Sequence, residues 1–206
     1  MTQTPISTST ALDEETARAE VYGLLATLFH ATPSAELHAN LRVAVTEAPA
    51  AGALLEASWT ELVAAAQRMS CADISREYNA LFVSVGKPEV TLFGSFYLSG
   101  FLNEKPLVAL RTDMAELGLA RDEMQPETED HVAYVFEIMR YLIAGDDVAV
   151  SNLTRQRVFF TRHVQSWLPA LCEVLAAHPK AVFYKAVAVF TEAFISVEAQ
   201  GFDMLE

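Results

Sequence analysis

The sequence contains little of what metal centres, disulfide frameworks and nucleotide sites require. Only two of its 206 residues are cysteines, Cys71 and Cys172, and they lie far apart with no CxxC or zinc-ligand spacing. Its five histidines form no HExxH pair, and no P-loop, GxGxxG or GxSxG motif occurs. We therefore expect buried free thiols in a reducing compartment, no bound metal or cofactor, and no catalytic residues.

Basic residues are also scarce. The chain has 14 lysines and arginines against 27 aspartates and glutamates, which gives a net charge of −13. Such a surface repels the phosphates of nucleic acids and anionic lipids, so neither is expected as a partner. A cationic partner would be attracted.

Long hydrophobic runs are missing as well. The most apolar stretch, AVFYKAVAVF, is interrupted by Lys185, so no membrane span is expected. The first ten residues, MTQTPISTST, include neither a basic nor an apolar signal-peptide region. The sequence therefore predicts a cytoplasmic protein, and its 52% apolar residues suffice for one sizeable core.

What the chain does contain is apolar residues at helical spacing along nearly its whole length. Asp13 and Ser34 are expected to cap the first two helices. A helix after Asp73 has a regular apolar stripe, formed by Ile74, Tyr78, Leu81, Phe82 and Val85. A helix with Phe160 and Val164 is expected to end at Pro169. The fold class predicted is all-α, a single bundle-like domain over residues 1–206.

One stretch breaks this periodicity. Between Gly86 and Pro106 there are five helix breakers in 21 residues. A loop with a short helix after Ser95 is expected there, because no second strand is available for pairing. Residues 86–105 are a candidate hinge between a possible N-terminal lobe, 11–85, and a possible C-terminal lobe, 106–200.

The segment PETEDHVAYVFEIM, residues 126–139, places three acids just before a histidine and an apolar helix. Glu127, Glu129 and Asp130 in a first helical turn would each gain about 0.3–1 kcal/mol from the helix dipole. The alternative interpretation is a binding site. His131 alone is more often a hydrogen-bonded, partly buried residue than a functional one.

Several separate blocks resemble the TorD/DmsD family of redox-enzyme maturation chaperones. They are Glu77-Tyr78-x-x-Leu81-Phe82, then Gly94-Ser95, then Glu129-Asp130-His131, then His163-x-x-x-Trp167-x-Pro169. The blocks occur in the family's order over roughly residues 76–184. Departures are Tyr78, where relatives often have tryptophan, and the longer spacing between Pro126 and Asp130.

The resemblance implies a cytoplasmic, all-helical chaperone without catalytic activity. Such a protein binds the twin-arginine signal peptide of a molybdenum-containing oxidoreductase until the molybdopterin cofactor is inserted. Arginine prefers bidentate carboxylate partners, and an apolar groove would bind the rest of the leader. The expected peptide-binding residues are Tyr78, Leu81, Phe82, Glu129, Asp130 and His131.

Two alternatives remain open. A nitrate-reductase-assembly chaperone, from a related family, would instead bind the N-terminus of a catalytic subunit that is not exported. A nucleotide hydrolase has no motif in its support. The oligomeric state expected is a monomer or a dimer that exchanges the helices beyond the hinge.

Overall fold

The computed structural model describes residues 8–46, 54–83, 86–122 and 124–204, with side chains from residue 14 onwards. Residues 1–7, which carry part of the signal-peptide expectation, and Val85 lie outside this set. The elements are α1 (Thr8–His30), α2 (Ala35–Arg42), α3 (Glu56–Arg68), α4 (Cys71–Phe82), α5 (Gly94–Ser99), α6 (Lys105–Glu116), α7 (Val132–Ala144), α8 (Leu153–Phe159), the π-helix η1 (Phe160–Gln165), α9 (Leu168–Ala177) and α10 (Phe183–Asp203).

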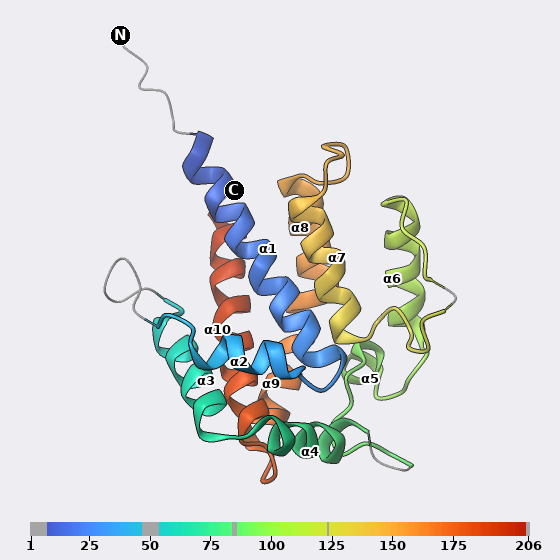
Figure 1. Ribbon diagram of the computed structural model, residues 1–206. Helices are drawn as coiled ribbons and strands as arrows, with labels where there is room; N and C mark the ends of the chain where they lie inside the picture. The colour runs from blue at the N-terminus through green and yellow to red at the C-terminus, as the bar shows by residue number, and fades with distance from the viewer. Residues whose placement is uncertain (1–7, 47–53, 84–85, 123, 205–206) are drawn as a thin grey trace.

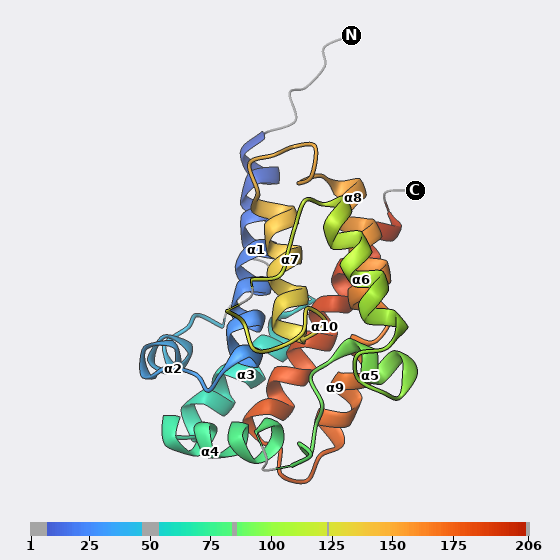
Figure 2. The same ribbon diagram turned by 90° about the vertical axis from the view of Figure 1, so that its right-hand side faces the viewer.

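The all-α prediction is confirmed. Long helices α1 and α7 lie side by side, and α10 packs against α9 and α3 (Figures 1 and 2). Helix α4 lies across one end of this bundle, while α6 stands at its side and contacts mainly α5 (Figure 1). Among the described residues, no helix combines the length and the apolar character needed to cross a bilayer.

The core runs through both halves of the chain. Its largest buried side chains are aromatic, and Tyr22 of α1 contacts the rings of Phe136 on α7 and Phe194 on α10 at 5.8 and 4.8 Å. Burying each such ring contributes about 1.5–3 kcal/mol. Residues from 11–85 and from 106–200 thus belong to one continuous core. The division into two lobes, and the hinge between them, stay predictions.

Helix starts agree with the sequence in part. Ser34 caps α2, because its Oγ accepts the Leu37 N–H at 3.1 Å. The expected cap at Asp13 is wrong, since α1 already begins at Thr8. Helix α4 begins at Cys71, capped by Ser70 rather than starting after Asp73. Helix ends depend on a few local hydrogen bonds. A serine that caps a helix therefore sets its first residue, and the spacing of apolar residues does not show this position.

Two further expectations need correction. The acids Glu127, Glu129 and Asp130 precede α7, so they do not lie in its first turn. One helix was expected to include Phe160 and Val164 and to end at Pro169. The structure instead has α8 followed by the π-helix η1, and Pro169 lies in the first turn of the next helix, α9. Proline is favoured at that position because the first-turn N–H has no intrahelical partner.

The stretch from Gly86 to Pro106 forms a loop with one short helix, as expected. Helix α5 runs from Gly94 to Ser99, and its C-cap Gly100 has a φ of +83° that favours glycine. Just before α5, Phe93 forms an isolated antiparallel bridge with His131. This bridge joins the loop to the segment that starts α7.

Candidate functional site

The two segments predicted to form the site meet around His30, at the end of α1. The Tyr78 hydroxyl donates to the carbonyl oxygens of Phe29 at 3.2 Å and His30 at 2.9 Å. The His30 ring lies 5.9 Å from that of Tyr134, which is in turn 5.7 Å from His131. The sequence-distant residues Tyr78 and His131 are therefore linked through two intervening rings.

The predicted residues of α4 belong largely to the core. Leu81 is completely buried, and Tyr78 is 6% exposed. Phe82 is half-buried, with its ring 5.0 Å from that of Tyr78 and 5.0 Å from that of Tyr184. Burial, with a smaller effect from the Glu127 carboxylate, raises the pKa of Tyr78 to about 12. These side chains support the site from beneath, and only Phe82 adds appreciable surface.

Glu129 is buried and already paired. Its two carboxylate oxygens accept from Nε and Nη2 of Arg111 on α6, both at 2.9 Å. Burial opposes ionisation of Glu129, but the hydrogen bonds and charge of Arg111 outweigh it and lower the pKa. A leader arginine that used this carboxylate in a bidentate pair would have to displace Arg111.

Asp130 connects the starts of α5 and α7. Its Oδ2 accepts from the backbone N–H of Ser95 at 2.9 Å, and its Oδ1 accepts from the Thr128 hydroxyl at 2.6 Å. Its carbonyl oxygen accepts from the N–H of Gly94 at 2.9 Å. A Cβ at Gly94 would lie 2.9 Å from the Trp167 ring, which explains why a glycine stands there. In this arrangement the buried carboxylate of Asp130 serves the fold.

His131 is the N-cap of α7. Its Nδ1 accepts the Ala133 N–H at 3.2 Å, so the buried ring is neutral with its proton on Nε2. Burial and, less strongly, the charge of His30 lower the pKa of His131 to about 4, although Asp130 acts in the opposite direction. A neutral, accepting imidazole is what a helix start requires.

This lowered pKa predicts a stability that falls in acid. The unfolded chain protonates His131 near pH 6.5, whereas the folded chain resists protonation until about pH 4. The free energy of unfolding is therefore unaffected by protonation of His131 above pH 6.5, and it falls by about 3 kcal/mol as the pH decreases toward 4. His131→Asn keeps a capping oxygen but does not titrate. Urea unfolding at pH 7 and pH 4 should show that this variant loses about 3 kcal/mol less unfolding free energy than the wild type does between the two pH values. An equal loss in both proteins would contradict the assignment.

Sequence reasoning did not assign a role to Glu77, which the structure places at the start of α10. Its Oε1 accepts the N–H groups of Val182 at 2.9 Å and Tyr184 at 2.8 Å, and its Oε2 accepts that of Phe183 at 3.1 Å. Helix α10 has no side-chain cap from its own N-cap residue. The signal that could have revealed this was an acid directly beside the apolar stripe of α4.

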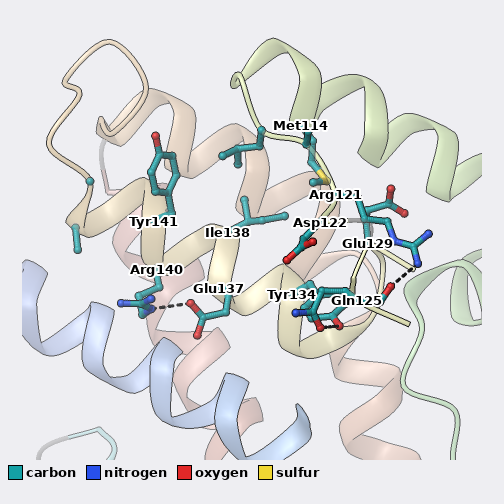
Figure 3. Close-up of a pocket in the computed structure, with 14 residues that line it drawn as sticks. Met114, Arg121, Asp122, Gln125, Glu129, Tyr134, Glu137, Ile138, Arg140 and Tyr141 are labelled. Atoms are coloured by element: carbon teal, nitrogen blue, oxygen red, sulfur yellow. Dashed lines mark hydrogen bonds and ion pairs between the residues drawn. The ribbon is translucent and has the colours of Figure 1, made fainter. Parts of the chain in front are cut away.

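Sequence reasoning also missed a groove between α7 and the segment that follows α6 (Figure 3). It encloses about 510 Å³, within the range of roughly 300–1,000 Å³ typical of ligand sites. Its apolar surface comes mostly from Met114, Leu119, Ala120, Tyr134, Ile138, Tyr141 and Ala144. Glu129 is part of its lining, so the groove adjoins the predicted peptide site. The segment after α6 has no helical period, so the sequence did not show that residues 119–122 and Gln125 lie opposite α7.

The described residues do not offer an evident catalytic centre. Within them, no group of three or more histidine, cysteine, aspartate or glutamate side chains could hold a metal ion. The Cys172 thiol is buried, and burial raises its pKa to about 12, which makes it a poor nucleophile at neutral pH. What the site combines is apolar surface and carboxylates, a combination suited to binding a polypeptide.

Comparison with known proteins gives a consistent result. The family model of the nitrate reductase delta subunit matches residues 48–173. The chaperone protein TorD of Vibrio cholerae is 26% identical over 204 residues, which cover 91% of this chain and 93% of that protein. TorD of Vibrio parahaemolyticus is 25% identical over 135 residues, 62% of this chain and 63% of the length of that relative.

The family match covers more than half of the chain and includes the motifs at Tyr78, Gly94 and Asp130. The Vibrio cholerae relative extends the similarity to 91% of the chain. The chain therefore belongs to the nitrate reductase delta subunit family. Together with the similarity to TorD, this match confirms the expected resemblance to maturation chaperones of the TorD/DmsD type.

Proposed function

We propose that this protein is a cytoplasmic chaperone that binds the twin-arginine leader of a molybdenum-containing oxidoreductase and assists cofactor insertion before export. The observation that carries the proposal is the similarity, over nearly the full chain, to proteins named chaperone protein TorD. The acidic character of the chain supports it, because a net charge of −13 favours encounter with a basic peptide. The chaperone acts by binding and not by catalysis.

The proposed site lies where α4, the end of α1 and residues 127–131 meet. Tyr78, Leu81 and Phe82 form its apolar support, while Glu129, Asp130 and His131 hold the acidic segment in place. The surface offered to a leader comes from their neighbours, since His30 is exposed and Glu127 and Tyr134 are half-buried. The Glu127 carboxylate lies close enough to influence the hydroxyls of both Tyr78 and Tyr134.

The free energies of ion pairing and of apolar burial differ, so charged and apolar groups contribute differently to leader binding. An exposed arginine–carboxylate pair contributes roughly 0.2–1 kcal/mol, whereas burying one leucine or phenylalanine of the leader contributes about 1.5–3 kcal/mol. Ordering a flexible leader costs on the order of 2–5 kcal/mol. Apolar contacts therefore supply most of the affinity, and the acids set the register and the rate of encounter.

Calorimetry with a synthetic twin-arginine leader tests the proposal. Replacing both arginines by alanine should weaken binding roughly two- to thirtyfold, as expected for two exposed pairs. Replacing two leucines of the apolar segment by serine should weaken it more, by about a hundredfold or beyond. Affinity for the native leader should also fall as salt rises. Absence of binding for every leader encoded beside this gene would contradict the proposal.

A second function is favoured by the family description itself, which names the nitrate reductase delta subunit. In that case the chain would bind the N-terminus of a non-exported molybdoenzyme catalytic subunit, using the same surface. A pull-down from the native host, followed by mass spectrometry, distinguishes the two. A client whose N-terminus has no arginine pair would favour this second function.

A further inference from the structure

The groove between α7 and the segment that contains Leu119 to Asp122 and Gln125 adjoins the proposed site and has no assigned role. One face of α7 packs along α1, whereas the face with Tyr134, Ile138 and Tyr141 turns toward the groove (Figure 3). These three residues are spaced as i, i+4 and i+7, so they form one stripe along two turns. Tyr141 remains 41% exposed in the described structure.

The stripe matches the dimensions of a short amphipathic helix. Tyr134 and Tyr141 are seven residues apart, which corresponds to about 10 Å along the helix axis. A peptide helix with apolar residues at i, i+3 or i+4, and i+7 presents side chains with the same spacing. Met114 and Leu119 provide the opposite wall.

The stretch of sequence that supplies much of the groove's lining is rich in acids. The 22 residues from 116 to 137 contain seven acids and one arginine, so they hold six of the thirteen excess negative charges of the chain. Asp122, Glu129 and Glu137 border the apolar surface together with Arg121 and Arg140, so acids are in the majority. This border favours a peptide that has both a cationic part and an apolar part. Neither nucleic acid nor an anionic membrane fits such a border.

The charges are also distributed unevenly along the groove. Asp122 and Arg121 lie at the end where α7 begins, near Tyr134, whereas Tyr141 lies at the other end (Figure 3). Glu129, at the first end, is paired with Arg111, and Glu137, toward Tyr141, is paired with Arg140 at 2.8 Å. The end near Tyr134 therefore keeps a small excess of negative charge, because Asp122 and Glu127 are both close to the Tyr134 hydroxyl and only Arg121 opposes them there.

We propose that this groove binds the apolar segment of the client's leader, parallel to α7, with the leader's arginines at the end near Asp122. The assignment rests on the proposed function, because the arginines of such a leader precede its apolar segment. The cationic start of the peptide then meets the acids, and its apolar helix follows the stripe toward Tyr141. The groove extends the proposed site along α7, away from Tyr78.

The first test uses a matched pair of surface variants in the full-length protein. Tyr141→Ser removes apolar surface from the groove, and Val174→Ser does so on α9, outside the groove, at a residue with 42% exposure. Calorimetry with the native leader should give a dissociation constant roughly tenfold higher for Tyr141→Ser, and no change for Val174→Ser. Equal affinities of all three proteins would overturn the groove assignment while leaving the chaperone function standing.

The second test determines the direction of the peptide. A photo-crosslinking residue is placed either beside the two arginines or at the end of the apolar segment, and the linked residues are identified by mass spectrometry. The first probe should link to residues 119–127 and the second to residues 141–145. The reverse pattern, or links outside the groove, would overturn the proposal.

The same protein samples distinguish a bound leader from a second copy of the chain as the occupant of the groove. If the wild-type protein binds no leader, both the proposed function and the groove assignment fail. If a second copy fills the groove, analytical ultracentrifugation will show a wild-type dimer that Tyr141→Ser dissociates, and the proposal is overturned. A concentration-independent mass that is equal in the wild type and Tyr141→Ser supports a peptide as the occupant.

Discussion

Replacing Glu77 by alanine is expected to destabilise the protein by about 3–5 kcal/mol. The substitution leaves three backbone N–H groups at the start of α10 without their acceptor, and each orphaned group costs about 1–3 kcal/mol before relaxation. It also removes a negative charge from the positive end of a 21-residue helix. Typical domains are stable by only about 5–15 kcal/mol, so the loss would be severe.

Urea denaturation followed by circular dichroism measures this effect, with Glu77→Gln as the matched control. Glutamine has the same shape and keeps one acceptor oxygen, but its amide group faces a donor and its charge is lost. We expect an intermediate loss of about 1–3 kcal/mol. A Glu77→Ala protein with the unfolding free energy of the wild type would show that α10 does not depend on this cap.

Replacing Asp130 by alanine is expected to cost about 2–4 kcal/mol of stability. Asp130 is 4% exposed, and its carboxylate accepts from the Ser95 N–H and the Thr128 hydroxyl. Among the described residues, no second acceptor is recorded for either donor. Burying an unsatisfied donor costs about 1–3 kcal/mol. The bonds also hold the start of α5 against the segment that precedes α7, so both elements would loosen.

Asp130→Asn and Thr128→Val serve as controls for this second prediction. Asn keeps one acceptor, and Thr128→Val removes only the hydroxyl donor, so each should cost less than Asp130→Ala, by about 1 kcal/mol or more. Leader binding should be measured on the same variants at a temperature where all are folded. If Asp130→Ala keeps the stability of the wild type and loses leader binding, Asp130 contacts the leader directly instead of positioning the segment.

Both predictions concern residues within motifs by which the family was identified. In the structure, Glu77 caps α10, Tyr78 bonds to the end of α1, and Gly94 allows the close approach of Trp167. Each of these contacts joins elements that are distant in sequence. The motif residues therefore stabilise the architecture around the proposed peptide site, and the proposed leader-binding surface lies beside them.

The helices and the fold class could be predicted because they depend on local spacing. Apolar residues at helical period identify α4 and α7 wherever these helices pack, and Gly86 to Gly100 interrupt the period irrespective of the tertiary structure. Helix ends were less certain, as the starts of α1 and α9 show, because caps depend on a few specific hydrogen bonds. The acidic balance and the family were equally accessible from the chain alone.

Which side chains are available to a partner was decided only by the tertiary structure. The sequence places acids at Glu129 and Asp130, but it does not show that Arg111 and Ser95 occupy them. It contains Tyr134, Ile138 and Tyr141 as one stripe, yet only the position of residues 119–122 and of Gln125 leaves that stripe open as a groove. The physical reason is that helical period arises from neighbours three or four residues apart, whereas burial, ion pairing and cavities arise from contacts between segments that the chain folds together.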